Sequence, residues 1–447
     1  MVGNGPIHYR FNSCLCIFHE GWRHIFSKHS QQPRSGGWYV KPAVRLSLYL
    51  LGLLTVLLQT GCVATPYYLQ SVTGHLAIMH AAKPIDQWLA DPQTPAALKA
   101  RLALAQRLRH FAVTDLGLPD NASYQRYADL HRSSAVWNVV AAPPYSLTLK
   151  TWCFPVVGCV GYRGYFDEAQ AQALATQLQS DGLEASVYGV PAYSTLGWMN
   201  WAGGDPLLNT FIRYPEGELA RMLFHELAHQ VLYVKGDTPF NESFATAVER
   251  LGSAAWLAQH ASVEARTQYA RFDARRRQFR TLTRQTRQEL ASIYESNEPL
   301  ALGATTQEAM KLRAMERFRE QYATLAAGWD ADDADDAARA SRVGPAAPPP
   351  LPHSGYDRWV AKANNAAFGA VAAYDQWVPA FEVLFARQNQ MGGNATVWPR
   401  FFDAVRQLAA LPKPERTQAL QRLSCGGPAK STQTELVEAG VVAVACN

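Results

Sequence analysis

The chain has 447 residues, of which 48% are hydrophobic, and a formal net charge of +5 at pH 7. This hydrophobic fraction is typical of a globular protein and excludes general disorder, and the length allows one large domain or two to three ordinary ones. Residues 1–61 carry six basic residues and one acidic residue, so the rest of the chain holds 36 residues of each sign. This balance argues against a nucleic-acid partner, because no basic patch remains outside the N-terminal segment.

The N-terminal segment predicts an exported protein. Residues 46–58 form an uncharged apolar run that follows Lys41 and Arg45. The run is too short to span a bilayer but suits the hydrophobic part of a secretory signal peptide. We expect residues 1–39 to be a spurious leader before a true start near Val40, and residues 40–61 to be the signal peptide.

The apolar run ends in Gly61-Cys62, which resembles the bacterial lipobox, whose cysteine is acylated and becomes the new N-terminus. Gln59 departs from the leucine that is usual in a lipobox. The resemblance implies a lipid on Cys62 as the contact with the membrane, on the periplasmic side of the envelope. Val63 follows the cysteine, which favours the outer membrane over the inner one.

Four further cysteines follow in the mature chain, namely Cys153, Cys159, Cys425 and Cys446. An even number in an oxidising compartment predicts disulfides, and three pairings are possible. Local pairing of Cys153 with Cys159 and of Cys425 with Cys446 is the simplest. Neither pair has the CxxC spacing that is typical of a metal site.

The remaining pattern predicts an α+β fold that is predominantly helical. Helices are expected at 67–116, with a break at Asp91-Pro92, and at 168–181, whereas 134–166, 185–190 and 207–214 favour strands. Nearly everything from Gly217 onward is helical, including two long amphipathic stretches within 253–325. Residues 329–353 are acidic and then rich in alanine and proline, which indicates a loop or linker before a last helical unit at 354–447.

Residues 215–236 contain the strongest chemical motif. Pro215 begins a helix that we expect to end at Lys235-Gly236, and His225, Glu226 and His229 lie inside it. A spacing of i, i+4 places both imidazoles on one face of the helix, where they can bind one metal ion. Glu226 then reaches a water molecule on the metal as a general base, which is the HExxH arrangement of zinc enzymes.

A catalytic zinc site needs a third protein ligand and an open fourth position. Thr238-Pro239 is predicted to begin a second helix that carries Glu242 and Glu249 on one face, two turns apart. Asn241-Glu242-Ser243-Phe244-Ala245 resembles the NExxA segment of the gluzincin metallopeptidases, whose glutamate is the third zinc ligand. The 12 residues between His229 and Glu242 are fewer than in well-studied gluzincins, and the 19 before Glu249 come closer. We follow the motif and assign Glu242 as ligand and Glu249 as a carboxylate behind the ligands, or as the alternative ligand.

The wider stretch from HELAHQ to NESFATAVER is similar to the putative aminopeptidase family of bacterial lipoproteins, as are WCFPVVGCVGYRGYF at 152–166 and AYSTLGW at 192–198. This resemblance implies a zincin-like catalytic core at 62–328, with a small mixed sheet and an active-site helix pair, flanked by helical units. It also implies one zinc ion, a peptide or protein substrate, and a tyrosine that stabilises the oxyanion, for which Tyr374, Tyr165 and Tyr193 are candidates.

Two alternatives remain open. Related exopeptidases anchor the free amine of the substrate with a Gly-x-Met-Glu-Asn strand, and this chain has Gly197-Trp198-Met199-Asn200 without the glutamate. An endopeptidase of the cell envelope is therefore one alternative. The other is a non-catalytic lipoprotein scaffold whose zinc site is structural, with a fourth histidine or cysteine ligand.

Overall fold

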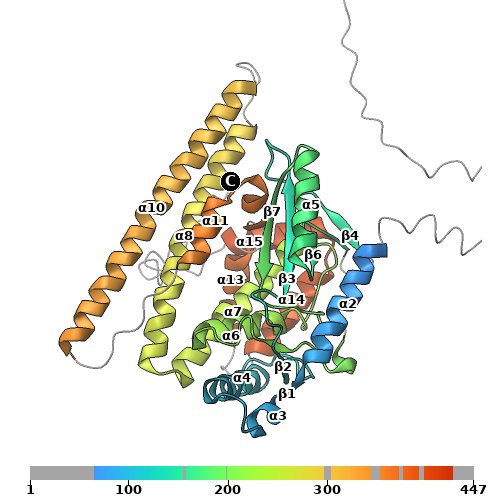
Figure 1. The fold of residues 1–447 in the computed structure, drawn as a ribbon, viewed down its shortest axis with the longest axis vertical. Helices are drawn as coiled ribbons and strands as arrows, with labels where there is room; N and C mark the ends of the chain where they lie inside the picture. Colours follow the sequence, from blue (N-terminus) through green and yellow to red (C-terminus); the bar gives the residue numbers. More distant parts are fainter. Residues whose placement is uncertain are drawn as a thin grey trace, which may run out of the picture. The chain divides into compact units, whose positions relative to one another are not determined.

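The computed structural model describes residues 65–154, 158–197, 199–295, 304–343, 353–371, 376–391 and 397–425. From Pro66 onward these residues belong to one compact unit. The α+β class with predominant helix is confirmed (Figure 1). No helix of these ranges is both long and apolar enough to cross a bilayer.

Three helices begin the described chain: α2 (Thr65–Ala81), α3 (Ile85–Ala90) and α4 (Ala96–Thr114). α3 and α4 each begin directly after a proline, Pro84 and Pro95, which is the N-cap residue of the helix. In α4 the residues Leu104, Leu108 and Phe111 recur at helical spacing and are buried, so this face belongs to the main core. Phe111 packs edge-on against Trp256 of α7 (Thr238–His260), and this contact joins α4 to α7.

The central sheet has the strand order β6-β3-β7, from β6 (Arg163–Tyr165), β3 (Val136–Ala142) and β7 (Glu184–Val190), and both pairings are antiparallel. Alternate residues of a strand face opposite sides of a sheet. On one side, Val139 and Ala141 pack against α5 (Glu168–Ser180). On the other side, Val140 and Ala142 pack against α12 (Asn365–Val371). The residues that continue this second face toward the start of β3 are Val136 and Asn138, and they line the cavity described below.

Two smaller sheets accompany the central one. β1 (Lys83–Pro84), β2 (Arg126–Ala128) and β8 (Leu207–Leu208) form a sheet of order β1-β2-β8, followed in the chain by α6. β4 (Trp152–Phe154) and β5 (Gly158–Val160) form an antiparallel pair in which Cys153 lies opposite Cys159. A short 3-10 helix, η1 (Asn200–Ala202), precedes β8. The strand expected at 207–214 is thus limited to its first two residues.

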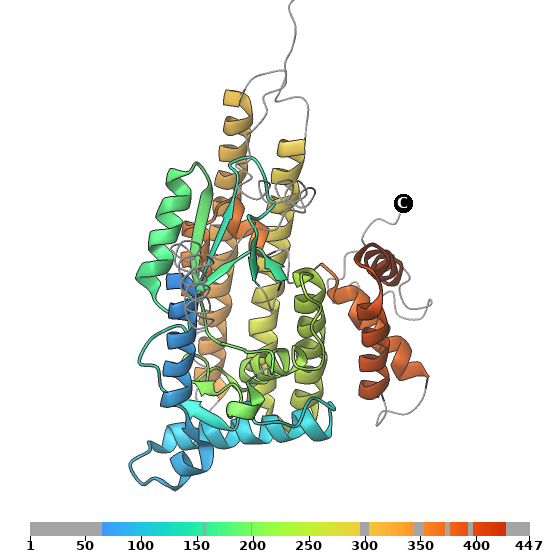
Figure 2. The same cartoon turned by 90° about the vertical axis from the view of Figure 1, so that its right-hand side faces the viewer.

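The helix pair α6 (Glu216–Ala228) and α7 (Thr238–His260) forms the centre of the main core. α6 buries Leu219, Leu223 and Leu227, which lie on one face because they are four residues apart. α7 buries Phe240 and Phe244, and both rings pack edge-on against a phenylalanine of α13 (Val378–Gln390). α14 (Val397–Ala410) and α15 (Lys413–Cys425) complete this helical layer (Figure 2).

Two long helices, α8 (Val263–Glu295) and α10 (Ala304–Val343), lie side by side in both views (Figures 1 and 2). They enclose a second core with α11 (Ser354–Ala361) and α12, built around Phe318 and Trp329. The structure corrects the loop expected from residue 329, because α10 continues to Val343. Trp329 is buried, and Asp333 pairs with Arg271 and Arg275 of α8, so this part of the acidic stretch is a packed helix.

Candidate functional site

His225, Glu226 and His229 lie at the C-terminal end of α6. The helix begins after Pro215, with Glu216 and Glu218 in its first turn, where carboxylates complement the positive end of the helix dipole. It ends at Ala228 rather than at Lys235-Gly236, which corrects the predicted end, and His229 is its C-cap residue. The His229 backbone N–H still donates to the His225 carbonyl, at 3.4 Å, so the two histidines keep their helical spacing.

The connection between α6 and α7 is held by one asparagine. The Asn241 side chain accepts a hydrogen bond from the Val234 N–H and donates one to the Val234 carbonyl, each at 2.8 Å. Gly236 has a φ of 74°, which favours glycine and lets the chain reverse before α7. Asn241 lies in the first turn of α7 and binds the connection at Val234. The next residue is Glu242, which therefore lies opposite the two histidines. This turn gives a physical reason for the short spacing before Glu242.

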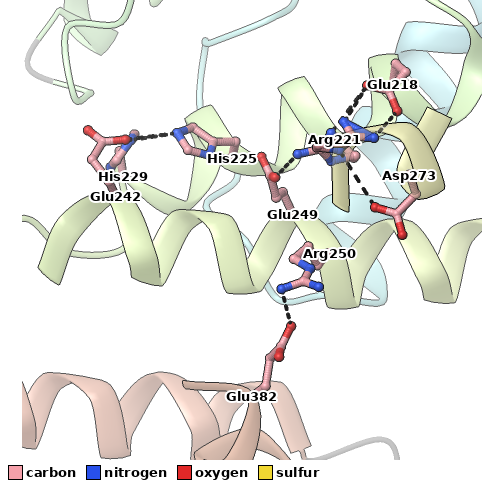
Figure 3. Close-up of polar contacts among 10 residues, drawn as sticks. Glu218, Arg221, His225, His229, Glu242, Glu249, Arg250, Asp273 and Glu382 are labelled. Carbon is pink, nitrogen blue, oxygen red and sulfur yellow. Dashed lines mark hydrogen bonds and ion pairs between the residues drawn. The ribbon is translucent and has the colours of Figure 1, made fainter. Parts of the chain in front are cut away.

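Three donor atoms converge between α6 and α7 (Figure 3). The Nε2 atoms of His225 and His229 are 3.2 Å apart, and the nearer Glu242 oxygen lies 3.4 Å from His225 Nε2 and 3.7 Å from His229 Nε2. Among the described residues, these are the one group of three histidine, cysteine or acidic side chains whose donor atoms come together closely enough to hold one metal ion.

Glu249 lies behind this group, on the far side of the His225 ring. Its Oε2 atom is 3.0 Å from His225 Nδ1, and its Oε1 atom accepts from Arg221. Burial alone would raise the pKa of Glu249, but Arg221 and His225 lower it to about 2. Glu242 likewise has a lowered pKa, because the two histidines outweigh the effect of its burial. Glu242 and Glu249 thus lie on the side of α7 that faces α6, but they face different nitrogens of His225.

A cavity of about 360 Å³ adjoins the three donor atoms, and Glu226 lines it together with His225, His229 and Glu242. Burial raises the pKa of Glu226, and both histidines oppose that rise. Most of the other lining side chains are apolar or aromatic and come from elements distant in the sequence: Tyr67, Val136, Phe154, Val160, Tyr162, Phe166, Val190, Ala192, Tyr193, Leu196 and Tyr233. Glu226 therefore lies in a cavity whose other lining residues are mostly apolar or aromatic.

The three tyrosines considered from the sequence lie in different surroundings. Tyr193 lines the cavity, whereas Tyr165 is buried against Tyr67, with ring centroids 5.6 Å apart, and is not among the lining residues. Tyr374 lies outside the described residues. The structure adds Tyr162 and Tyr233 as lining residues that sequence reasoning missed. For both, burial raises the pKa, and the negative charge of Glu242 raises it further.

The first predicted cysteine pair is present as a disulfide between Cys153 and Cys159. It joins β4 to β5, and this hairpin contributes Phe154 and Val160 to the cavity wall. Cys446 lies outside the described residues, so the pairing of Cys425 with Cys446 stays a prediction. Cys62 also lies outside them, and its lipidation stays a prediction.

A family described as putative aminopeptidase, Aminopep, matches residues 66–420. No curated protein matches the chain. No solved structure matches it either. The family match spans most of the chain and includes α6, α7 and the cavity wall. On this basis the chain belongs to the putative aminopeptidase family.

Proposed function

We propose that this chain is a zinc-dependent peptidase in which His225, His229 and Glu242 bind one zinc ion and Glu226 acts as the general base. One observation carries the proposal, namely the spacing of the three donor atoms. Ligand atoms about 2.0–2.2 Å from a tetrahedral zinc ion lie about 3.3–3.6 Å from one another. The separations between Nε2 of His225, Nε2 of His229 and the Glu242 oxygen are 3.2, 3.4 and 3.7 Å.

The chemistry of the donor set supports zinc. Two imidazoles and one carboxylate form a ligand set that catalytic zinc sites use, with water or substrate in the fourth position. His225 also has the partner that zinc-binding histidines need, because its Nδ1 faces the Glu249 carboxylate at 3.0 Å. Such a partner holds the proton on Nδ1 and leaves Nε2 free to bind the metal.

The surroundings favour a catalytic site over the structural site of a scaffold. A structural site would contain a fourth histidine or cysteine, and the group formed by the described residues has no such member. The donor atoms instead border the cavity of about 360 Å³, which gives a substrate access to them. We therefore prefer the enzyme to the scaffold alternative.

Bound zinc would supply Lewis acidity, which acidifies water and polarises the carbonyl oxygen of a peptide bond. Glu226 would accept a proton from the attacking water as the water oxygen forms a bond to the carbonyl carbon. The same carboxylic acid would then give that proton to the leaving nitrogen as the C–N bond breaks. Burial, which raises the pKa of Glu226, suits a group that both takes and returns a proton. Four described tyrosines line the cavity and could supply an oxyanion donor, namely Tyr67, Tyr162, Tyr193 and Tyr233.

The family name favours an aminopeptidase, but one observation supports an endopeptidase as a second candidate. Glu226 and Glu242 are the two carboxylates that line the described part of the cavity, and both already have roles in the proposed mechanism. An aminopeptidase needs a further anion to bind the free ammonium group of its substrate. Hydrolysis rates for matched peptides with free and N-acetylated ends decide between the two. Faster hydrolysis of the acetylated peptides supports the endopeptidase, and strict dependence on a free amine supports the aminopeptidase.

We also propose that the protein is exported and anchored in the envelope through Cys62. The apolar run followed by Gly61-Cys62 supports this location. The Cys153–Cys159 disulfide supports it independently, because both cysteines are exposed, and exposed disulfides persist in oxidising compartments. A periplasmic location would give the enzyme access to envelope proteins and peptides.

The direct test of the mechanism is Glu226→Gln. This change keeps the shape of the side chain and all three proposed ligands but removes the base. We expect zinc binding and thermal stability to remain, and peptidase activity to fall by about 100- to 10,000-fold, the contribution typical of general acid–base catalysis. Unchanged turnover would show that Glu226 is not the base.

A further inference from the structure

A line of buried and partly buried charged residues leads from His225 to α8. We call it the charged chain and define it as Glu249 of α7, Arg221 and Glu218 of α6, and Arg276 of α8 (Figure 3 labels the first three). Each member contacts the next, and the first contacts a proposed zinc ligand. The mechanism above uses the first member alone.

The geometry at the inner end of the charged chain is specific. Arg221 is four residues before His225, so the two side chains lie on the same face of α6, one turn apart. Between them, Glu249 presents Oε2 to His225 Nδ1 at 3.0 Å and Oε1 to the Arg221 guanidinium. The side chains of Glu249 and Arg221 are only 8% and 13% exposed. One carboxylate thus connects the guanidinium to the imidazole.

The outer end fixes the guanidinium in turn. The second Arg221 amino group, Nη1, lies 3.3 Å from Glu218 Oε2. Arg276 of α8 donates two hydrogen bonds to the same Glu218 carboxylate, at 3.0 and 2.8 Å. Two-pronged contacts of this kind restrict the orientation of both partners. The close approach of α8 supports this contact, because a Cβ atom at Gly217 of α6 would collide with the Tyr269 ring of α8.

A buried carboxylate with one partner can rotate about its last torsion angle, and a buried charge is costly without compensation. At Glu249, Arg221 prevents both the rotation of the carboxylate and the cost of an uncompensated buried charge. It supplies the opposite charge and holds Oε1, so that Oε2 stays directed at His225 Nδ1. A fixed acceptor at Nδ1 sets the ring orientation and leaves Nε2 for the metal. The orientation of the ligand therefore depends on a guanidinium that is not itself near the donor atoms.

We propose that Arg221 is a positioning residue for the zinc site, which acts through Glu249 on His225, and that Glu218 and Arg276 extend this support to α8. The inference rests on the proposed function and deepens it. A partly exposed arginine–glutamate pair nearby serves as a comparison for a purely structural role. Arg250 of α7 pairs with Glu382 of α13 at 3.0 Å, joins two helices, and has no contact with a proposed ligand.

The test compares Arg221→Met with the control Arg250→Met in the full-length protein. Zinc affinity is measured by competition with a chromophoric chelator, and Co²⁺ binding is followed by visible absorption. We expect Arg221→Met to weaken zinc binding about 10- to 100-fold, the range of an outer partner of a ligand, and to alter the Co²⁺ spectrum. Arg221→Lys, which keeps the charge, is expected to restore part of the affinity. Arg250→Met is expected to change zinc affinity less than about 3-fold, whatever its effect on stability.

A double-mutant cycle separates positioning from general destabilisation. In a Glu249→Gln background, Arg221→Met should add little further loss, because its effect passes through Glu249. The inference would be overturned if the losses of zinc affinity in the two single variants multiply in the double variant. It would also be overturned if Arg221→Met folds and keeps its zinc affinity. If Arg221→Met fails to fold, Arg276→Met tests the same chain from α8, with a measurable loss of zinc affinity expected and no loss contradicting it. Failure of the wild-type protein to bind zinc would refute the proposed function together with this inference.

Discussion

Replacing Glu242 should weaken zinc binding more than replacing Glu249. The Glu242 oxygen lies on the Nε2 side of both histidines, at 3.4 and 3.7 Å, whereas Glu249 faces Nδ1 of His225. The two nitrogens of an imidazole point in divergent directions, so Glu249 cannot reach a metal at Nε2 without a rotation of the ring. The structure therefore distinguishes the two carboxylates by the nitrogen that each one faces.

The size of each effect follows from the role. Structural zinc sites bind with about 10–16 kcal/mol, so one of four ligands contributes about 2.5–4 kcal/mol, or about 100- to 1,000-fold in affinity. Glu242→Gln should lose an amount of this order. Glu249→Gln should lose about 10- to 100-fold, as expected for a partner that orients a ligand.

The assay is zinc competition with a chelator at fixed pH, with Glu382→Gln as a control. Glu382 is a partly exposed glutamate of α13 that pairs with Arg250, and its replacement should leave zinc affinity unchanged. A larger loss for Glu249→Gln than for Glu242→Gln would refute the reasoning. It would mean that the spacing of 19 residues after His229 identified the ligand better than the NExxA motif.

Three further predictions follow from the same structure. Asn241→Ala removes both hydrogen bonds to Val234 and should destabilise the fold by about 1–3 kcal/mol and weaken zinc binding. Chemical denaturation measures the loss of stability, and chelator competition measures the loss of zinc affinity. An unchanged zinc affinity would show that the turn does not position Glu242. Cys153→Ser or Cys159→Ser should lower the free energy of unfolding by about 2 kcal/mol, the chain-entropy value for so short a loop. A reductant should lower the stability of the wild type to that of the variants. A wild-type stability that does not change with reductant would contradict this prediction. Mass spectrometry of the native protein should find an acylated Cys62 at the N-terminus, and peptides from residues 1–61 in mature material would disprove cleavage.

Much of the candidate site could be predicted because its signal is local. The i, i+4 spacing of His225 and His229 depends only on one helix, and the structure keeps it even though α6 ends at Ala228. The NExxA motif predicted Glu242, which lies close to both histidines, and the hydrogen bonds of Asn241 hold the short turn before it. The two-turn separation of Glu242 and Glu249 likewise follows from helix geometry alone.

The remainder depends on contacts between distant segments. Tyr162 and Tyr233 are 71 residues apart in the sequence, and both line the cavity because β3, β6 and the turn before α7 meet there. No spacing rule connects them. Arg276 of α8 and Glu218 of α6 are 58 residues apart in the sequence, and their contact in the charged chain depends on how the two helices pack.

Composition also misled the prediction for residues 329–343. The acidic and then alanine- and proline-rich composition indicated an exposed loop or linker. Alanine also favours helix, however, and Asp333 and Asp336 pair with arginines of α8. Asp333 pairs with Arg271 and Arg275, and Trp329 fills the second core. Whether an acidic stretch is solvated or packed is decided by a partner helix that the local sequence does not contain.

The central claim is that His225, His229 and Glu242 hold one zinc ion. Metal analysis of the purified protein tests it most directly, with His225→Ala and His229→Ala beside the wild type and Glu382→Gln as the control. The account predicts one zinc per chain in the wild type and the control, and little or none in the two histidine variants. Full zinc content in both histidine variants, with folding intact, would contradict it.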